Sequence, residues 1–178
     1  MIYLKYVLSI IVLCSSIYPQ INFNIIKIIN LPEILTNEKF NPTNFCVSPT
    51  GLYFLDSIKR QVAFLSNEDD VAFAGGYGIY NDAFIDPIEI LNSKLRVWIV
   101  DRTENELIEF DHKLNYLRTI EFDQIYPEFS GIDDWGNILL QSEQEQHIYK
   151  AMPPLQNFEE FIDLALWSDT NNCITDIH

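Results

Sequence analysis

The stretch that decides the fold is PIEILNSKLRVWIVDRTENELIEFDHKLNYLRTIEF, residues 87–122. It contains four short apolar runs separated by polar, turn-forming residues, and the second run ends in an aspartate at 101. Short runs rich in β-branched and aromatic residues, bounded by Asn, Asp and Ser, are typical of strands joined by hairpins. The stretch therefore predicts four antiparallel strands in succession.

The same pattern occurs three times along the chain with a fixed internal phase. In each copy a proline lies 14 residues before the same point in a hydrophobic strand. The pairs are Pro42 with Asp56, Pro87 with Asp101, and Pro127 with Gln141. The prolines are 45 and 40 residues apart, so the phase is kept although the unit length varies. This indicates an internal repeat.

Four strands in a repeat of about 40–45 residues are typical of a β-propeller blade. We expect an all-β chain, an incomplete β-propeller with blades at about 40–75, 85–122 and 127–164. Residues 21–31 resemble a lone fourth strand, and residues 170–178 resemble the first strand of a fourth blade. The best helical candidate is 157–167, although its place in the repeat also fits a strand and a connection.

Residues 1–20 have the composition of a secretory signal peptide. A single Lys5 precedes an apolar run that ends at Cys14, and small residues and Pro19 follow. We expect cleavage between Cys14 and Gln20, and the alternative is an uncleaved N-terminal anchor. A lipid-modified Cys14 is disfavoured by the bulky Leu13 before it.

The chain is strongly acidic, with a formal net charge of −15. Without residues 1–20, which carry one lysine and no acid, the charge is −16. Such a polyanion repels nucleic acid and anionic lipid headgroups. We therefore expect an extracytoplasmic protein, periplasmic or secreted, that has no nucleic-acid partner and no membrane span after cleavage.

Beyond Cys14 only Cys46 and Cys173 remain. One pair could form a disulfide in an oxidising compartment, but it is not a disulfide framework. The two cysteines fall at equivalent places of the repeat, where small buried apolar side chains are the favoured interpretation.

The second unit resembles the NHL repeat, a family of β-propeller proteins. The resemblance is carried by a glycine-rich approach, a Phe-x-x-Pro motif, a strand ending in Asp, and an Asn-led strand that also ends in Asp. These residues are Gly75, Gly76, Gly78, Phe84, Pro87, Asp101, Asn105, Ile108, Phe110 and Asp111. The first unit keeps Phe40, Pro42 and Asp56, and the third keeps Pro127 but has Gln141 in place of the aspartate.

NHL-like propellers usually have six blades, so the resemblance implies that about half of a ring is missing. The chain would then be a truncated product of a longer reading frame, or it would assemble with a second chain. Unpaired strands and open sheet edges would favour self-association.

The acidic turn at Asp133, Asp134 and Trp135 is the candidate binding site. It follows a first strand, close to where a propeller channel would lie. Calcium could bind these oxygens, although their spacing is not diagnostic. Trp135 would make an exposed aromatic contact or would pack on the hairpin beneath it. Glu89 and Asp133 are the acidic side chains expected to point inward.

No catalytic or metal motif is evident, so we expect neither catalytic residues nor a bound cofactor. His112 falls in a turn, His178 is the last residue, and His147 aligns with Val62 and Leu107. The Gly-rich segment at 75–78 leads to a strand, whereas a phosphate-binding loop leads to a helix.

The sequence therefore favours an exported, non-enzymatic scaffold that presents loops to a protein, peptide or glycan partner. The alternative is a metal-dependent propeller hydrolase or lyase, resembling lactonases or peptidylglycine lyases, with its site completed by absent blades.

Overall fold

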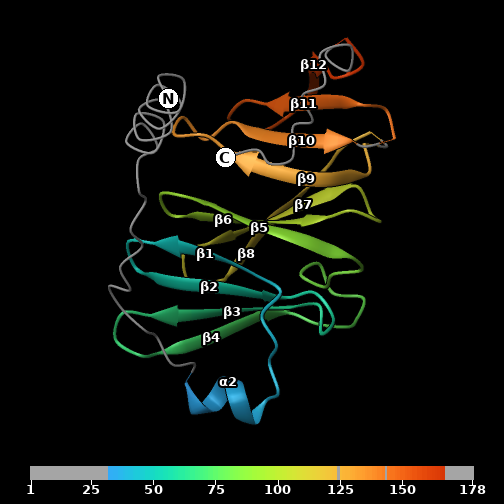
Figure 1. Cartoon of the computed structure of the whole chain (residues 1–178). Coiled ribbons are helices and arrows are strands. Elements are labelled where there is room, and N and C mark those ends of the chain that lie inside the picture. Colours follow the sequence, from blue (N-terminus) through green and yellow to red (C-terminus); the bar gives the residue numbers. More distant parts are fainter. Residues whose placement is uncertain (1–31, 124, 143, 167–178) are drawn as a thin grey trace, which may run out of the picture. The chain divides into compact units, whose positions relative to one another are not determined.

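The computed structural model describes residues 32–123, 125–142 and 144–166. These residues form three antiparallel sheets of four strands, and each sheet keeps its strands in sequence order (Figure 1). We call the sheets blades 1, 2 and 3. The expected all-β class, with three four-stranded units, is confirmed. The predicted signal peptide and the expected strands at 21–31 and 170–178 lie outside the described residues.

The strands follow the predicted apolar runs. Blade 1 consists of β1 (Asn44–Ser48), β2 (Gly51–Asp56), β3 (Gln61–Ser66) and β4 (Val71–Gly75). Blade 2 consists of β5 (Pro87–Ser93), β6 (Arg96–Asp101), β7 (Glu106–Asp111) and β8 (Tyr116–Glu121). Blade 3 consists of β9 (Pro127–Ile132), β10 (Ile138–Ser142), β11 (His147–Ala151) and β12 (Glu159–Asp163). The helical candidate at 157–167 is wrong, because β12 pairs with β11 there.

A short helix that the sequence analysis did not predict, α2 (Glu33–Asn37), precedes blade 1. Pro32 occupies its N-cap position, where the absence of a backbone N–H breaks no helical hydrogen bond. Leu35 is fully buried, and the Phe40 ring that follows lies 6.3 Å from the ring of Phe73 on β4. The segment after the helix therefore packs on blade 1 through Phe40, and Lys59 Nζ donates a hydrogen bond to the Glu38 carbonyl at the helix C-cap.

Antiparallel pairing gives every blade two distinct ends. The turns that follow the first and third strands lie at one end, which we call the turn end. The turns that follow the second strands and the connections between blades lie at the other, which we call the connection end. Asn92 Nδ2 on β5 donates a hydrogen bond to the Val47 carbonyl on β1 at 3.2 Å, so the first strands of blades 1 and 2 run side by side.

Blades pack on one another through alternating residues of their second strands, as the two-residue period of a strand requires. The core between blades 1 and 2 contains Tyr53, Leu55, Val97 and Ile99. The core between blades 2 and 3 contains Trp98, Val100, Ile138 and Leu140. Each blade thus presents one set of alternate positions to the blade before it and the other set to the blade after it.

This alternation corrects part of the expected burial. The apolar runs predict that six second-strand residues pack between blades: Leu52, Phe54, Val97, Ile99, Ile138 and Leu139. Val97, Ile99 and Ile138 are buried, but Leu52, Phe54 and Leu139 are only half-buried. Leu52 and Phe54 lie on the face of blade 1 turned away from blade 2, and Leu139 lies on the face of blade 3 turned away from blade 2.

The alignment of the third repeat is also corrected, because Ser142 and not Gln141 is the counterpart of Asp101. Asp101 Oδ1 accepts the Glu104 N–H at 3.3 Å, and Ser142 Oγ accepts the Glu145 N–H at 3.4 Å. The first hairpin of blade 3 has a five-residue turn at 133–137, where blades 1 and 2 have two residues. The turn is longer but the two strands are shorter than in blade 2. The spacing from the proline to the end of the second strand is therefore one residue longer in blade 3.

The same shift corrects the place of His147. It pairs with Ser142 as Glu106 pairs with Asp101, so its counterpart in blade 2 is Glu106 and not Leu107. Its Nε2 lies 3.6 Å from Glu160 Oε1 and 3.7 Å from Asp163 Oδ1. His147 is therefore placed beside carboxylates at the start of a strand.

Candidate functional site

The predicted residues Asp133, Asp134 and Trp135 form the turn between β9 and β10 at the turn end. Asp133 Oδ1 accepts the backbone N–H groups of Trp135 at 3.0 Å and Asn137 at 2.9 Å, and Oδ2 accepts Asn137 Nδ2 at 2.6 Å. Partial desolvation raises the pKa of Asp133, but these hydrogen bonds outweigh it and hold that pKa below its usual value. The carboxylate is thus charged and committed to its own turn.

A second turn in the chain has the same internal bonding. Asp111 Oδ1 accepts the N–H groups of Lys113 and Asn115 at 2.8 and 2.9 Å, and Oδ2 accepts Asn115 Nδ2 at 2.9 Å. The sequence pattern Asp-x-x-x-Asn therefore closes a hairpin in two blades. This recurrence identifies the Asp133 carboxylate as a turn-forming group.

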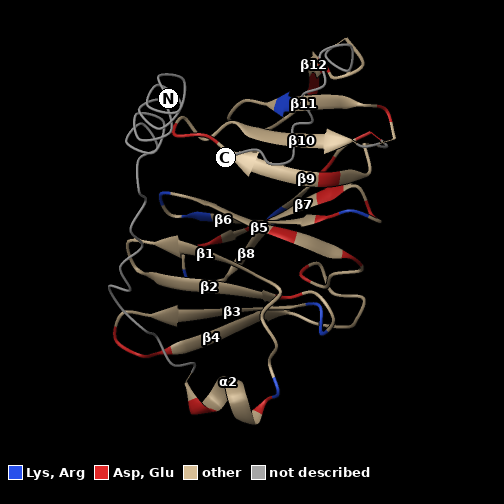
Figure 2. Cartoon of the chain, in the orientation of Figure 1, with Lys and Arg blue, Asp and Glu red and all other residues tan. Residues whose placement is uncertain are grey.

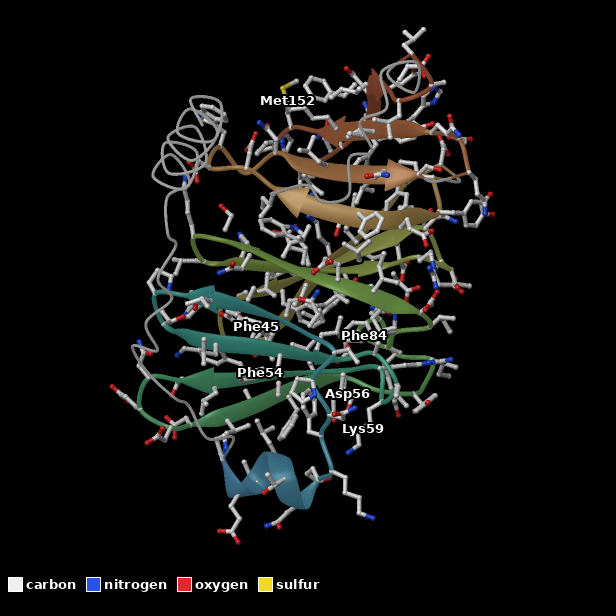
Figure 3. The ribbon with its side chains drawn as sticks, viewed as in Figure 1. Phe45, Phe54, Asp56, Lys59, Phe84 and Met152 are labelled. Carbon is white, nitrogen blue, oxygen red and sulfur yellow. The ribbon has the colours of Figure 1, made fainter. Side chains whose placement is uncertain are left out.

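Trp135, in contrast, is 81% exposed, so it does not pack on the hairpin beneath it. Its neighbour Gly136 lies close to Pro153 and Ser93, since a Cβ added there would be 3.6 Å from Pro153 Cγ and 3.9 Å from Ser93 Oγ. Met152, next to Pro153 in the chain, is also exposed at this end (Figure 3). Leu95, in the β5–β6 turn, is exposed too. The turn end of blade 3 therefore carries an exposed aromatic side chain supported by a fixed turn.

The inner strands hold the other expected inward carboxylate. Asn44 Nδ2 on β1 donates a hydrogen bond to Glu89 Oε1 on β5. Burial, reinforced by the Glu89 charge, raises the pKa of Cys46 to about 12, so this half-buried thiol stays protonated. Among the described residues, no group of three or more His, Cys, Asp and Glu side chains is arranged to hold a metal ion.

The connection end carries a surface that the sequence analysis did not single out. Residues 76–86 join β4 to β5, whereas residues 122–126 join β8 to β9. The first connection is therefore six residues longer. We call residues 76–83 the Tyr77 loop. Its tip places Tyr77, Ile79 and Tyr80 in solvent, with Ile79 99% exposed.

The base of the Tyr77 loop is fixed in the core. Phe84 is buried between blades 1 and 2, and Gly75 has a φ of +83° that favours glycine. A Cβ on Gly75 would overlap the Phe84 ring, so only glycine allows this close approach. The Gly76 N–H also bonds to the Arg60 carbonyl at 2.6 Å.

The neighbouring β2–β3 turn holds the Tyr77 ring in place. Tyr77 Oη donates to the Ile58 carbonyl at 2.9 Å, and the Arg60 guanidinium carbon lies 4.7 Å from the ring centroid. Asp56 and Lys59 close this turn, because Asp56 Oδ1 accepts the Lys59 N–H at 2.9 Å (Figure 3). Ile58 itself is exposed beside the loop. Apolar residues enclosed by Gly, Asn and Asp in "GGYGIYND" were the sequence signal for such an exposed loop.

Comparison with known proteins identifies the architecture. No protein-family model and no curated protein matches the chain. A streptogramin B lyase structure matches with a TM-score of 0.53 at 14% identity, over 67% of this chain and 40% of the lyase. Virginiamycin B lyase from Staphylococcus aureus matches with a TM-score of 0.55 at 14% identity, over 71% and 42%.

A Bacteroides fragilis protein assigned as exported matches with a TM-score of 0.55 at 12% identity, over 69% of this chain and 38% of that one. The described chain is part of a β-propeller. The aligned region spans well under half of each matched structure. At these identities the likeness extends to the fold, and the NHL resemblance and the number of blades stay predictions.

Proposed function

We propose that this protein is an exported β-propeller scaffold that binds a protein partner through the Tyr77 loop. The observation that carries the proposal is the extra length of the β4–β5 connection, whose added residues are exposed and apolar. Insertions in repeat proteins commonly map to the binding face. Tyr and Arg are the residues enriched where interfaces derive most of their affinity, and Tyr77, Tyr80 and Arg60 supply them.

A protein partner is favoured over a glycan because of the aliphatic side chains in the patch. Ile58 and Ile79 add apolar area that a hydrated sugar would not bury well, whereas the core of a protein interface does. Trp135 at the turn end is a second candidate contact, which could engage the same partner or another one.

Export is supported by the signal-like residues 1–20 and by the match to the Bacteroides fragilis protein. Among the described residues, no helix has the length and hydropathy that a membrane span requires.

The binding proposal is tested with a photo-crosslinking amino acid at position 79. We expect a discrete crosslinked product in the extracytoplasmic fraction of the source cells, and we expect it to disappear when Tyr77 and Tyr80 are both changed to Ser. The matched control carries the crosslinker at Leu117, an exposed position on β8. Equal products from positions 79 and 117, or a product unaffected by the tyrosine changes, would contradict the proposal.

A metal-dependent lyase or hydrolase is the second candidate, and the matches to streptogramin B lyases favour it. Calcium or zinc would then be retained after dialysis, and the purified chain would act on virginiamycin B. Mass spectrometry of the antibiotic and metal analysis of the protein test this candidate.

A further inference from the structure

A cleft of about 560 Å³ lies at the turn end between blades 1 and 2, on the opposite end from the Tyr77 loop. One wall is the β3–β4 turn with Glu68 and Asp70, and the other is the β7–β8 turn with His112 and Lys113. Phe64 and Ala72 form an apolar floor. The volume falls in the range of small-ligand sites, about 300–1,000 Å³.

The backbone of the acidic wall is held rigidly. Ser66 Oγ accepts the N–H groups of Glu68 at 3.2 Å and Asp70 at 3.0 Å. Asn67 ties this turn to the β1–β2 turn, because its N–H donates to the Thr50 carbonyl at 3.1 Å and its Nδ2 to the Pro49 carbonyl at 2.9 Å. The acidic wall is therefore preorganised.

The opposite wall is fixed against the floor. Tyr53 Oη donates to the His112 carbonyl at 2.7 Å, and the Tyr53 ring stacks on Phe64 with centroids 4.6 Å apart. The Asp111 turn described above holds the Lys113 backbone. Tyr53 thus links the basic wall to the floor, and Asn67 ties the acidic wall to the β1–β2 turn.

The charged side chains that line the cleft are not used by the fold. Glu68, Asp70 and Lys113 are exposed, and none of them forms an ion pair with another described residue. In Figure 2 the β3–β4 turn appears as a continuous acidic segment at the edge of blade 1. Carboxylates therefore face one side of the cleft, and an ammonium group is available on the other.

We propose that this cleft binds a zwitterionic ligand of dipeptide size. The ligand's ammonium group contacts Glu68 and Asp70, its carboxylate contacts Lys113, and its apolar side chain lies over Phe64. One molecule with both charges satisfies both walls, whereas a simple cation or anion leaves one wall unpaired. The site is independent of the proposed function of the Tyr77 loop.

The test is a titration of the isotope-labelled full chain with alanyl-leucine, followed by NMR of the backbone amides. We expect saturable shifts at Glu68, Asp70 and Lys113. N-acetyl-alanyl-leucine lacks the ammonium group, and alanyl-leucine amide lacks the carboxylate. Each should bind more weakly by roughly tenfold or more, since each loses a charge-assisted hydrogen bond.

Two variants assign the charges to their walls. Lys113→Gln should lower the affinity for alanyl-leucine by the same factor as amidation of the peptide does. It should leave the affinity for alanyl-leucine amide unchanged. Lys94→Gln removes the same charge from another exposed turn at this end and is the matched control. The proposal is overturned by an absence of shifts at millimolar alanyl-leucine, by equal binding of all three peptides, or by equal effects of the two lysine changes.

Discussion

At the scale of single residues, buried carboxylates at the ends of second strands fix the connections between blades. Asp101 is fully buried and accepts the N–H groups of Ile85 at 2.6 Å, Asp86 at 3.1 Å and Glu104 at 3.3 Å. It therefore joins the incoming connection to the turn that leaves β6. Asp56, at the same place in blade 1, caps its turn in this way too, since its Oδ1 accepts the Lys59 N–H.

Changing Asp101 to Ala should destabilise the protein by more than about 2 kcal/mol, because three backbone N–H groups lose the buried carboxylate that accepts their hydrogen bonds. Urea denaturation measures the loss. The control is Asp134→Ala, an exposed turn residue whose replacement should change stability by less than about 0.5 kcal/mol. Equal losses in the two variants would contradict this role of Asp101.

Glu106 gives the fold a defined pH dependence. Burial, followed by the charges of Asp101, Glu104 and Glu121, raises its pKa from 4.5 to about 7. The folded state therefore binds this proton more tightly than the unfolded state does, so its stabilising contribution is complete below pH 4.5 and is lost as the pH rises to about 7.

Glu106→Gln should remove that dependence, because the amide does not ionise. Melting curves across this window should show the wild-type Tm falling relative to the variant as pH rises. Glu121→Gln, which removes one neighbouring charge, should reduce the difference without abolishing it. A constant Tm difference between wild type and Glu106→Gln at all pH values would contradict the assignment.

At the scale of elements, the burial of a second-strand residue depends on whether another blade packs against the face on which that residue lies. Ile99 on β6 is fully buried because blade 1 packs against its face, whereas Leu139 on β10 lies on the face turned away from blade 2 and is half-buried. The same apolar composition in two strands thus contributes differently to stability.

Ile99→Ala should destabilise the protein by about 2–4 kcal/mol through loss of packing and the cavity it leaves. Leu139→Ala should cost less, and replacing Lys113 or Glu104, in exposed turns, should cost under about 0.5 kcal/mol. Chemical denaturation of the four variants measures this order. Similar losses at Ile99 and in the turns would mean that the blade register is wrong.

At the scale of the whole molecule, the described sheets leave two blade faces without a neighbouring described sheet. Phe45 and Val47 on β1 are 64% and 65% exposed on one of them, and Phe129 on β9 is exposed on the other. At the equivalent position between blades 1 and 2, Ile90 is buried. Exposed apolar sheet faces of this kind favour association.

We therefore expect purified residues 21–178 to associate and not to behave as a stable monomer. Light scattering coupled to size exclusion measures this, and changing Phe45 and Val47 to Lys should shift the protein toward monomer. A cooperative melt from a well-folded monomer would contradict association through these faces.

Export makes a separate prediction for the whole chain. If residues 1–20 act as a signal peptide, protein from the extracytoplasmic fraction should begin between Ser15 and Ile21. N-terminal sequencing decides this. An intact Met1 on soluble cytoplasmic protein would contradict export.

Local signals in the sequence are enough to predict the strand pattern and the repeat. Period-two apolar runs and turn residues are local signals, so the twelve strands and the turn-capping aspartates could be read from the chain. The predicted alignment of blade 3 was wrong by one residue, because its first hairpin turn is longer than those of blades 1 and 2. The offset from the proline does not show where the extra residue lies.

Only the tertiary structure decided which residues are available for binding. The sequence predicted Asp133 as a binding residue, but its carboxylate accepts hydrogen bonds from Trp135 and Asn137 in its own turn. Trp135 beside it is exposed. The Tyr77 loop and the cleft at Glu68 and Lys113 depend on contacts between segments that are distant in the chain. Sequence periodicity reports the face a residue takes in its own strand, but exposure depends on what packs against that face.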